Sequence, residues 1–301
     1  TYTTNGQQLP SVAALGAGKF VVVWMSSGQD GSGNGVYAQR YAADGTKEGG
    51  EFLVNTETSS HQQKPSVAHL GSGKFVVAWE SFGQDVSNIW GTYAQRYYAD
   101  GTKEGSEFQV NTYTTHNQDY PSVAALDAGK YVVAWQSYHQ ASGSSQEDIY
   151  AQRYKADGTK EGTEFLVNTE TSNTQMSPFV AGLGAGNFVV VWQSYGQDAS
   201  STNGIYLQQY SMGGCAACGS GTYRAKGDST TGATTSCDAC PAETYSTGTA
   251  AECSPWSLCA AGHYNSAPLA TANDNRFVSD AGVITLFNRS VEGVTVNVSQ
   301  R

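Results

Sequence analysis

Short apolar runs recur along most of the chain, separated by glycine-rich or polar segments. The first copy sets the order: Ser11–Leu15, Phe20–Trp24, Val36–Tyr41 and Glu51–Asn55. Short runs of this kind, bounded by turn residues, are typical of β-strands. The continuous apolarity of the second run predicts burial on both faces, whereas the alternation of the third predicts a half-exposed strand. We therefore expect an all-β protein.

This pattern is written four times, with a period of about 56 residues. The tryptophan of the second run marks it at spacings of 55, 56 and 57 residues: Trp24, Trp79, Trp135 and Trp192. A fixed period of this length predicts one supersecondary unit that is repeated and stacked. Four antiparallel strands per unit, with a tryptophan in the second, are typical of a propeller blade. We expect a four-bladed β-propeller over residues 1–212, with the tryptophans and the PSVAAL segments in its core.

Asp-Gly pairs link the third and fourth runs in the first three repeats and predict hairpin turns, because both positions tolerate positive φ. These pairs are Asp44-Gly45, Asp100-Gly101 and Asp157-Gly158. The fourth repeat has Gln209 in place of an arginine, and no EFLVN-type run follows it. At the other end, residues 1–4 match residues 112–115, which come just after the EFQVN run, the second of this type. We interpret the chain as a mature, processed or fragmentary form whose last blade lacks a strand.

The repeats resemble the PSVAAL…VVVW…GQD…YAQRY.ADG…EF.VNT repeats of large bacterial surface and adhesin-like proteins. The resemblance covers about residues 1–210 and rests on these motifs. It implies an extracellular, β-propeller-like array, and it implies no characterised reaction.

Composition narrows the class of partners. The net charge is −10 and the pI is about 4.9, which argues against nucleic acid, because phosphate binding relies on lysine and arginine. No apolar run reaches the roughly 20 residues that a membrane-spanning helix needs. Only 14% of residues are charged, and glycine (35) and tyrosine (18) are frequent, as expected for short strands and many turns. We expect a secreted or cell-surface protein.

All six cysteines lie between residues 215 and 259, in the order C-x2-C, C-x2-C and C-x5-C: Cys215, Cys218, Cys237, Cys240, Cys253 and Cys259. The first four have the spacing of a zinc ribbon. Two further cysteines and a segment too poor in apolar residues for its own core favour disulfides. We therefore expect a disulfide-rich module over residues 213–268, with zinc as the alternative.

The segments between these cysteines, GSGTY, PAETYSTGTAAEC and AAGHY, resemble the cysteine-rich modules of ephrin-receptor-like and tumour-necrosis-factor-receptor-like proteins. Glu243 stands where that pattern has glycine. The resemblance implies disulfides, and nearest-neighbour pairing (Cys218 with Cys237, Cys240 with Cys253) is one of fifteen connectivities.

Residues 269–301 return to strand-like sequence and form the predicted C-terminal β-tail. Two N-glycosylation sequons begin at Asn288 and Asn297, and together with the cysteines they indicate a secreted glycoprotein. Two segments end, like Phe52–Asn55, on apolar residues followed by asparagine; the residues we assign to the assembly strand are Thr285, Leu286, Phe287, Val294 and Val296. We expect one of them to fill the vacant blade edge, either in its own propeller or in the next molecule. The separation of some 60 residues from Tyr210 favours the next molecule, and hence a head-to-tail polymer.

The only recurrent polar motif is Gly-Gln-Asp, in the loop after the tryptophan run. In the first repeat Asp30, Ser32 and Asn34 place oxygen atoms at alternating positions, as in the first half of a calcium loop. Calcium is thus the cofactor candidate, and the alternative is an Asx-type turn between strands.

No constellation indicates catalysis. The five histidines occupy non-equivalent places in the repeats, and a catalytic pair would have to break the repeat symmetry. We therefore expect a non-enzymatic extracellular structural protein that assembles with copies of itself into a surface filament, sheath or hair-like appendage. The alternative is an adhesive, lectin-like propeller that binds cell-surface glycans.

Overall fold

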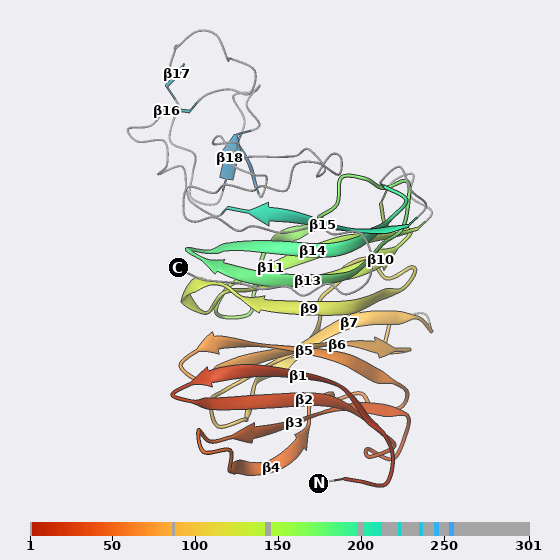
Figure 1. Ribbon diagram of the computed structural model, residues 1–301, viewed down its shortest axis with the longest axis vertical. Helices are drawn as coiled ribbons and strands as arrows, with labels where there is room; N and C mark the ends of the chain where they lie inside the picture. The colour runs from red at the N-terminus through yellow and green to blue at the C-terminus, as the bar shows by residue number, and fades with distance from the viewer. Residues whose placement is uncertain are drawn as a thin grey trace. The chain divides into compact units, whose positions relative to one another are not determined.

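The computed structural model describes residues 2–85, 88–141, 146–197 and 202–211, together with four short strands between residues 222 and 255. In this part the protein is all-β and propeller-like: each repeat forms one antiparallel sheet, and the four sheets pack on one another in chain order (Figure 1). Three sheets have four strands and the last has three. The all-β repeat fold is therefore confirmed, and so is the missing strand in the described part of the fourth repeat.

The first sheet contains β1 (Gln7–Gly16), β2 (Lys19–Ser27), β3 (Asn34–Tyr41) and β4 (Lys47–Leu53). The second contains β5 (Gln62–Gly71), β6 (Lys74–Phe82), β7 (Trp90–Tyr97) and β8 (Lys103–Gln109). The third contains β9 (Gln118–Ala125), β10 (Tyr131–Tyr138), β11 (Glu147–Tyr154) and β12 (Lys160–Leu166), with the 3₁₀ turn η1 (Asp127–Gly129) after β9. The fourth contains β13 (Gln175–Gly184), β14 (Asn187–Tyr195) and β15 (Asn203–Tyr210).

Two short pairs follow: β16 (Thr222–Tyr223) with β17 (Thr235–Ser236), and β18 (Thr244–Ser246) with β19 (Cys253–Pro255). The predicted domain boundaries at residues 212 and 268 lie outside the described residues. No helix in the described ranges is long and apolar enough to cross a membrane.

The first strand of each sheet is interrupted by a proline. β1 begins before the expected Ser11–Leu15, and its register with β2 shifts around Leu9, which has φ 54°. Pro10 has no N–H to donate, so it is accommodated where a bulge breaks the ladder. The residues before the other three repeat prolines also have positive φ: Lys64, Tyr120 and Ser177.

Strand alternation gives each sheet two different apolar faces. We call one the tryptophan face; in the first sheet it carries Phe20, Val22, Trp24, Tyr37 and Tyr41. We call the other the valine face; in the first sheet it carries Val21, Val23, Val36 and Ala38. The later sheets present the same two faces at equivalent positions.

The valine face of each sheet packs on the tryptophan face of the next, and this contact forms three separate cores. In the first core, Val21 and Val23 pack with Phe75, Val77 and Trp79, all of which are completely buried. Both faces of the second and third sheets are covered in this way, so β6 and β10 are buried on both faces, as the sequence predicted. The prediction is wrong for the first sheet: Trp24 is only partly buried and most of the PSVAAL segment in β1 is partly or fully exposed, because no other sheet of the described part covers this face.

The expectation that the third strand of each repeat is half-exposed is wrong. β7 and β11 are almost entirely buried, because neighbouring sheets cover both of their faces, and β3 is largely buried as well. Only β15, in the fourth sheet, is mostly exposed or partly buried. Each of the three buried strands carries a buried glutamine whose amide nitrogen donates to backbone carbonyl groups, while its Oε1 has no hydrogen-bond partner in the described part. Gln95, for example, is fully buried and donates through Nε2 to the carbonyl oxygens of Arg96 (2.8 Å) and Gly105 (3.1 Å).

The Asp-Gly turns form as expected, but only the glycine takes positive φ, 83° at Gly45. Asp44 instead accepts hydrogen bonds from the backbone N–H (2.9 Å) and the hydroxyl (2.7 Å) of Thr46. These bonds stabilise the ionised carboxylate and hold the pKa of Asp44 below its usual value. The same arrangement recurs at Asp100 and Asp157.

A buried asparagine joins one sheet to the next. Asn111, in the link that follows β8, accepts from the Thr92 N–H (2.8 Å) and donates to the Tyr113 carbonyl (2.8 Å) and to Gln118 Oε1 (3.1 Å). These contacts connect the third strand of the second sheet, the link itself and the first strand of the third sheet. Asn55 and Asn168 make equivalent bonds to Val36 N–H and Ile149 N–H.

We expect Asn111→Ala to lower the free energy of unfolding by at least about 2 kcal/mol, since each buried polar group left without a partner costs about 1–3 kcal/mol. Urea unfolding of the full chain, followed by tryptophan fluorescence, measures this. Asn203→Ala is the matched control: Asn203 is exposed, and its loss should cost less than about 0.5 kcal/mol. Equal effects of the two substitutions would contradict the role given to Asn111.

Candidate functional site

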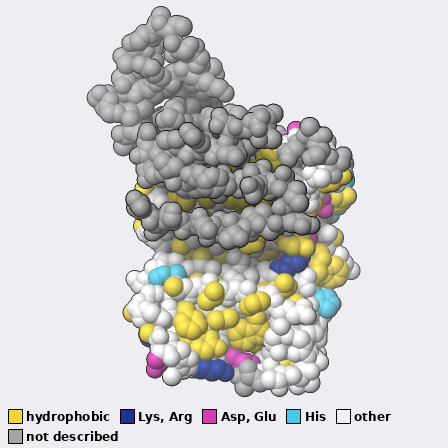
Figure 2. All heavy atoms as spheres, in the orientation of Figure 1, with side chains coloured by type: hydrophobic (Ala, Val, Ile, Leu, Met, Phe, Trp, Pro, Cys, Tyr) yellow, Lys and Arg dark blue, Asp and Glu magenta, His cyan; other side chains and the backbone are white. Residues whose placement is uncertain are grey.

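The tryptophan face of the first sheet is not covered by another sheet. Val12 is 64% exposed there, whereas the equivalent Val67 and Val123 are 7% and 6% exposed. Phe20, Val22 and Trp24 are only partly buried. Figure 2 shows the resulting gathering of hydrophobic side chains over β1 and β2. This face departs from the burial pattern of the repeats, and it is our candidate site.

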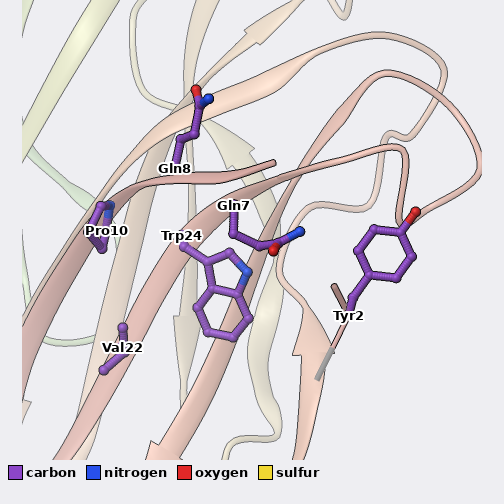
Figure 3. A pocket seen from close by; sticks show the side chains of 6 residues that line it. All are labelled: Tyr2, Gln7, Gln8, Pro10, Val22 and Trp24. Atoms are coloured by element: carbon purple, nitrogen blue, oxygen red, sulfur yellow. The ribbon is translucent and has the colours of Figure 1, made fainter. Parts of the chain in front are cut away.

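An open hollow of about 310 Å³ lies on this face (Figure 3). It is lined by Tyr2, Gln7, Gln8, Pro10, Val22 and Trp24. In the second sheet the residues equivalent to Gln7, Pro10 and Trp24 are all buried: Gln62, Pro65 and Trp79. The hollow is thus the place that a preceding sheet occupies elsewhere in the protein.

Hydrogen bonds near the chain start shape the rim of the hollow. Asn5 donates through Nδ2 to the Tyr2 hydroxyl (3.2 Å) and to the Ser27 carbonyl (3.2 Å), which ties Tyr2 to the end of β2. Gln7 Nε2 donates to the Asn5 carbonyl (2.7 Å) and lies beside the Trp24 indole (Figure 3). An indole flanked by amides offers an apolar surface with polar groups at its edge, which suits another apolar face or the flat side of a sugar.

Tyr37 lies beside the Trp24 indole on the same face of the sheet. Its ring is 6.5 Å from that of Trp24 and nearly parallel to it. Burial, and then the negative charges of Asp30 and Glu51, raise the pKa of Tyr37 to about 12. Its hydroxyl therefore stays protonated at neutral pH.

The calcium candidates lie on one loop, where Asp30 Oδ1 accepts a hydrogen bond from the Ser32 N–H (3.1 Å) in an Asx-type turn. Asn34 turns away and donates to Gln63 Oε1 (3.2 Å). Asp30 Oδ2 is buried, with no hydrogen-bond partner in the described part. No group of three or more His, Cys, Asp or Glu side chains in the described ranges is placed to hold a metal ion. The turn is therefore observed, and the calcium site stays a prediction.

In the second repeat the same aspartate has a clear structural use. Asp85 Oδ1 accepts from the hydroxyl of Tyr93, the equivalent of Tyr37, and from Gln109 Nε2 (2.9 Å). Burial raises the pKa of Asp85 despite these bonds. The aspartate of the Gly-Gln-Asp motif thus anchors the loop to the third and fourth strands.

Sequence reasoning missed the role of the glutamine in this motif. Gln84 Nε2 donates to Glu107 Oε1 (2.6 Å), and Glu107 Oε2 accepts from the backbone N–H of Thr56 in the preceding repeat (2.6 Å). The third repeat reproduces both bonds with Gln140, Glu164 and Thr112. The joint recurrence of this glutamine and of the glutamate in EFxVN was the available signal. These glutamine and glutamate side chains belong to the contact between repeats.

The recurrent arginine also serves the contact between repeats. Arg40 donates to the Ala99 carbonyl (2.7 Å), which lies next to the Asp-Gly turn of the second repeat. Arg96 makes the same contact to Ala156 in the third repeat (2.9 Å). Gln209 replaces this residue in the fourth repeat.

The structure brings together two histidines that the sequence did not connect. The rings of His116 and His139 are 5.1 Å apart, beside Tyr113 and Tyr138. His139 takes the place of the motif glycine and has φ 60°. The cluster is specific to the third repeat.

A polar cluster lies between the second and third sheets, near their first strands. Glu80, 1% exposed, accepts from Gln63 Nε2 (2.8 Å), Lys64 Nζ (3.1 Å) and the Tyr120 N–H (2.9 Å). Both oxygens of the carboxylate thus accept at least one bond, and Glu80 binds the backbone of the bulge in β9, the first strand of the next repeat. Asp119 lies beside this cluster.

Burial, and then the negative charge of Glu80, raise the pKa of Asp119 from 3.8 to about 7. The folded chain therefore keeps a proton that the unfolded chain releases between about pH 4 and 7, so stability should fall as pH rises through this window and level off above it. Urea unfolding at several pH values measures the slope, which Asp119→Asn should remove. Asp157→Asn is the control, since its lowered pKa affects stability only at acidic pH. A slope that persists in Asp119→Asn would contradict the assignment.

The remaining predicted sites lie outside the described residues. They comprise the side chains of the six cysteines, the sequons at Asn288 and Asn297, and the tail segments at Thr285–Phe287 and Val294–Val296. Only the backbone of Cys253, at the start of β19, falls within the described part. The disulfide, glycosylation and assembly assignments therefore stay predictions.

No family model and no curated protein matches the sequence. Similar solved structures include a protein of unknown function from Dyadobacter fermentans, with 12% identity and a TM-score of 0.49 over 69% of this chain and 66% of that one. An α-L-arabinanase from Penicillium chrysogenum has 14% identity and a TM-score of 0.49 over 69% and 64%. The GH93 α-L-arabinofuranosidase of Fusarium graminearum has 12% identity and a TM-score of 0.47 over 67% and 62%. This chain spans about two thirds of their length or slightly less, and likeness at this level carries no inference about activity.

Proposed function

We propose that this chain is a non-enzymatic, extracellular structural protein that assembles with copies of itself into a surface filament, sheath or hair-like appendage. The observation that carries the proposal is the use of the recurrent polar residues. Gln84, Glu107, Asn111 and Arg96 all bind within or between repeats, which leaves the uncovered apolar faces at the array ends as the main surfaces for partners. The recurrent polar residues thus serve to hold the sheets in a stack.

The extracellular location is supported by sequence features. The repeats resemble those of bacterial surface and adhesin-like proteins, the cysteines are clustered, and two sequons are present. Disulfides and N-glycans belong to secreted proteins.

The fourth sheet supports a role for the tail in assembly. No fourth strand pairs with β15 in the described part, so the polar backbone groups at this edge suit an added strand. In the other repeats the fourth strand also supplies a phenylalanine that packs on a tyrosine of the next sheet. These pairs are Phe52 with Tyr97, Phe108 with Tyr154 and Phe165 with Tyr210, at 5.3 to 5.5 Å. We propose that Phe287, in the tail segment from Thr285, takes this place in a donated strand.

Deletion of residues 281–301 from the full chain tests this role. We expect the intact protein to form concentration-dependent fibres in negative-stain electron microscopy, and the deleted form to give shorter fibres or none. Fibres of unchanged length and number after the deletion would contradict strand donation. A full chain that stays monomeric at every concentration would contradict the structural function itself.

The hollow at Trp24 favours one alternative, an adhesive protein that binds cell-surface glycans. Its indole and amides are the groups that stack on a sugar and bind its hydroxyls. A glycan array with the full chain should then show saturable binding that Trp24→Ala weakens by about tenfold or more. Trp90→Ala is the matched control, because Trp90 is a partly buried tryptophan of the second repeat. Absence of saturable binding would exclude this alternative.

A further inference from the structure

The two ends of the described array expose faces that neighbouring sheets cover elsewhere. At one end lies the tryptophan face of the first sheet, described above. At the other end, the valine face of the fourth sheet exposes Phe179 (73%) and Ile205 (64%). The positions equivalent to Ile205 in the first and third repeats, Val36 and Ile149, are completely buried.

The open tryptophan face has the same residues as the covered ones. Phe20, Val22 and Trp24 stand at the positions of Phe75, Val77 and Trp79 in the second sheet, in the same register with their third strand. Phe20 also stacks on Tyr41 at 4.8 Å, as Phe75 stacks on Tyr97 at 4.9 Å. The first sheet therefore presents a surface already shaped for the valine face of another sheet.

The open valine face is more apolar than the covered ones. Leu207 stands where the first three repeats have alanine: Ala38, Ala94 and Ala151. Phe179 stands where they have serine: Ser11, Ser66 and Ser122. A terminal repeat that faces water needs a polar outer surface, and this substitution pattern is the opposite. The fourth sheet is therefore built to be covered.

We infer that the tryptophan face of the first sheet in one copy docks on the valine face of the fourth sheet in a second copy, an inference that rests on the proposed function and names its interface. Consecutive first strands lie against one another, β1 on β5, β5 on β9 and β9 on β13, but no contact of similar extent joins β13 to β1 in the described part. Within the described part the two faces therefore do not meet each other, and the inferred contact is one between molecules. A heterologous contact of this kind repeats without closing and builds a filament.

The substitutions in the fourth repeat suit this junction. Between the internal sheets, Ser66 Oγ accepts from the Val123 N–H (3.0 Å) and Ser122 Oγ accepts from the Val180 N–H (3.1 Å). The residue equivalent to Val123 in the first sheet is Val12, so docking brings the exposed Phe179 against the exposed Val12. An apolar contact thus replaces a hydrogen bond at the junction between molecules.

Two single substitutions in the full chain test the junction. Val12→Asp places a carboxylate on the tryptophan face, and Ile205→Asp places one on the valine face; both side chains are 64% exposed, so the fold should persist, which circular dichroism checks. Burial of an unpaired carboxylate is costly, and each variant alone should require about 100-fold higher concentration to associate in sedimentation velocity. Tyr98→Asp, at a 44% exposed site of the second repeat, is the matched control and should associate like the unaltered chain.

A mixture of the two variants gives the sharper readout. Each variant keeps one intact face, so a 1:1 mixture should form dimers and stop there. Unaltered association of both variants, or a mixture that stays monomeric, would overturn the inference.

Filaments that survive both substitutions but are lost on deletion of residues 281–301 would overturn this interface and leave the proposed function standing. Dimers in the mixture without filaments from the full chain would support the interface and contradict the function.

Discussion

Each sheet of this protein has two apolar faces, and only another sheet covers them. Val21 and Val23 of the first sheet, for example, are buried against Phe75 and Trp79 of the second. Burial of apolar area is the main favourable term in folding, so a single repeat cannot be stable alone. The rest of the structure follows from this need: the period, the order of the sheets and the uncovered ends.

Polar contacts set the geometry of the stack. Each of three polar contacts joins a repeat to its neighbour at a different place; they are made by Asn111, Glu107 and Arg96. Because unsatisfied buried groups are costly, these bonds select one arrangement among the many that apolar packing alone would allow. They also explain why the recurrent polar residues need no ligand to account for their recurrence.

The same logic separates structure from function in this chain. Glu80 and Asp119 form a buried acidic pair with one raised pKa, a pattern that also marks active sites. Here the groups that donate to Glu80 are side chains and a backbone N–H of the protein itself, and Glu80 thereby holds the second and third sheets together. Within the described part, the repeat packing does not use the two end faces or the edge of β15, and these are surfaces suited to association.

The sequence by itself determined the all-β class, the four repeats and the Asp-Gly turns, and it predicted the three-stranded sheet seen in the described part of the fourth repeat. These features come from local strand and turn motifs and from a strict repeat period, both of which can be read directly from the sequence. The burial of Gln95 could not be predicted, because its amide nitrogen donates to carbonyl groups up to ten residues away. The pairing of His116 with His139 and the use of Gln84 were hidden for the same reason.

Only the tertiary structure decided which faces are covered. Alternation shows which residues share a face, but the same residues are buried at Trp79 and open at Trp24. What differs is the presence of a neighbouring sheet, which is a property of position in the stack and not of the local sequence.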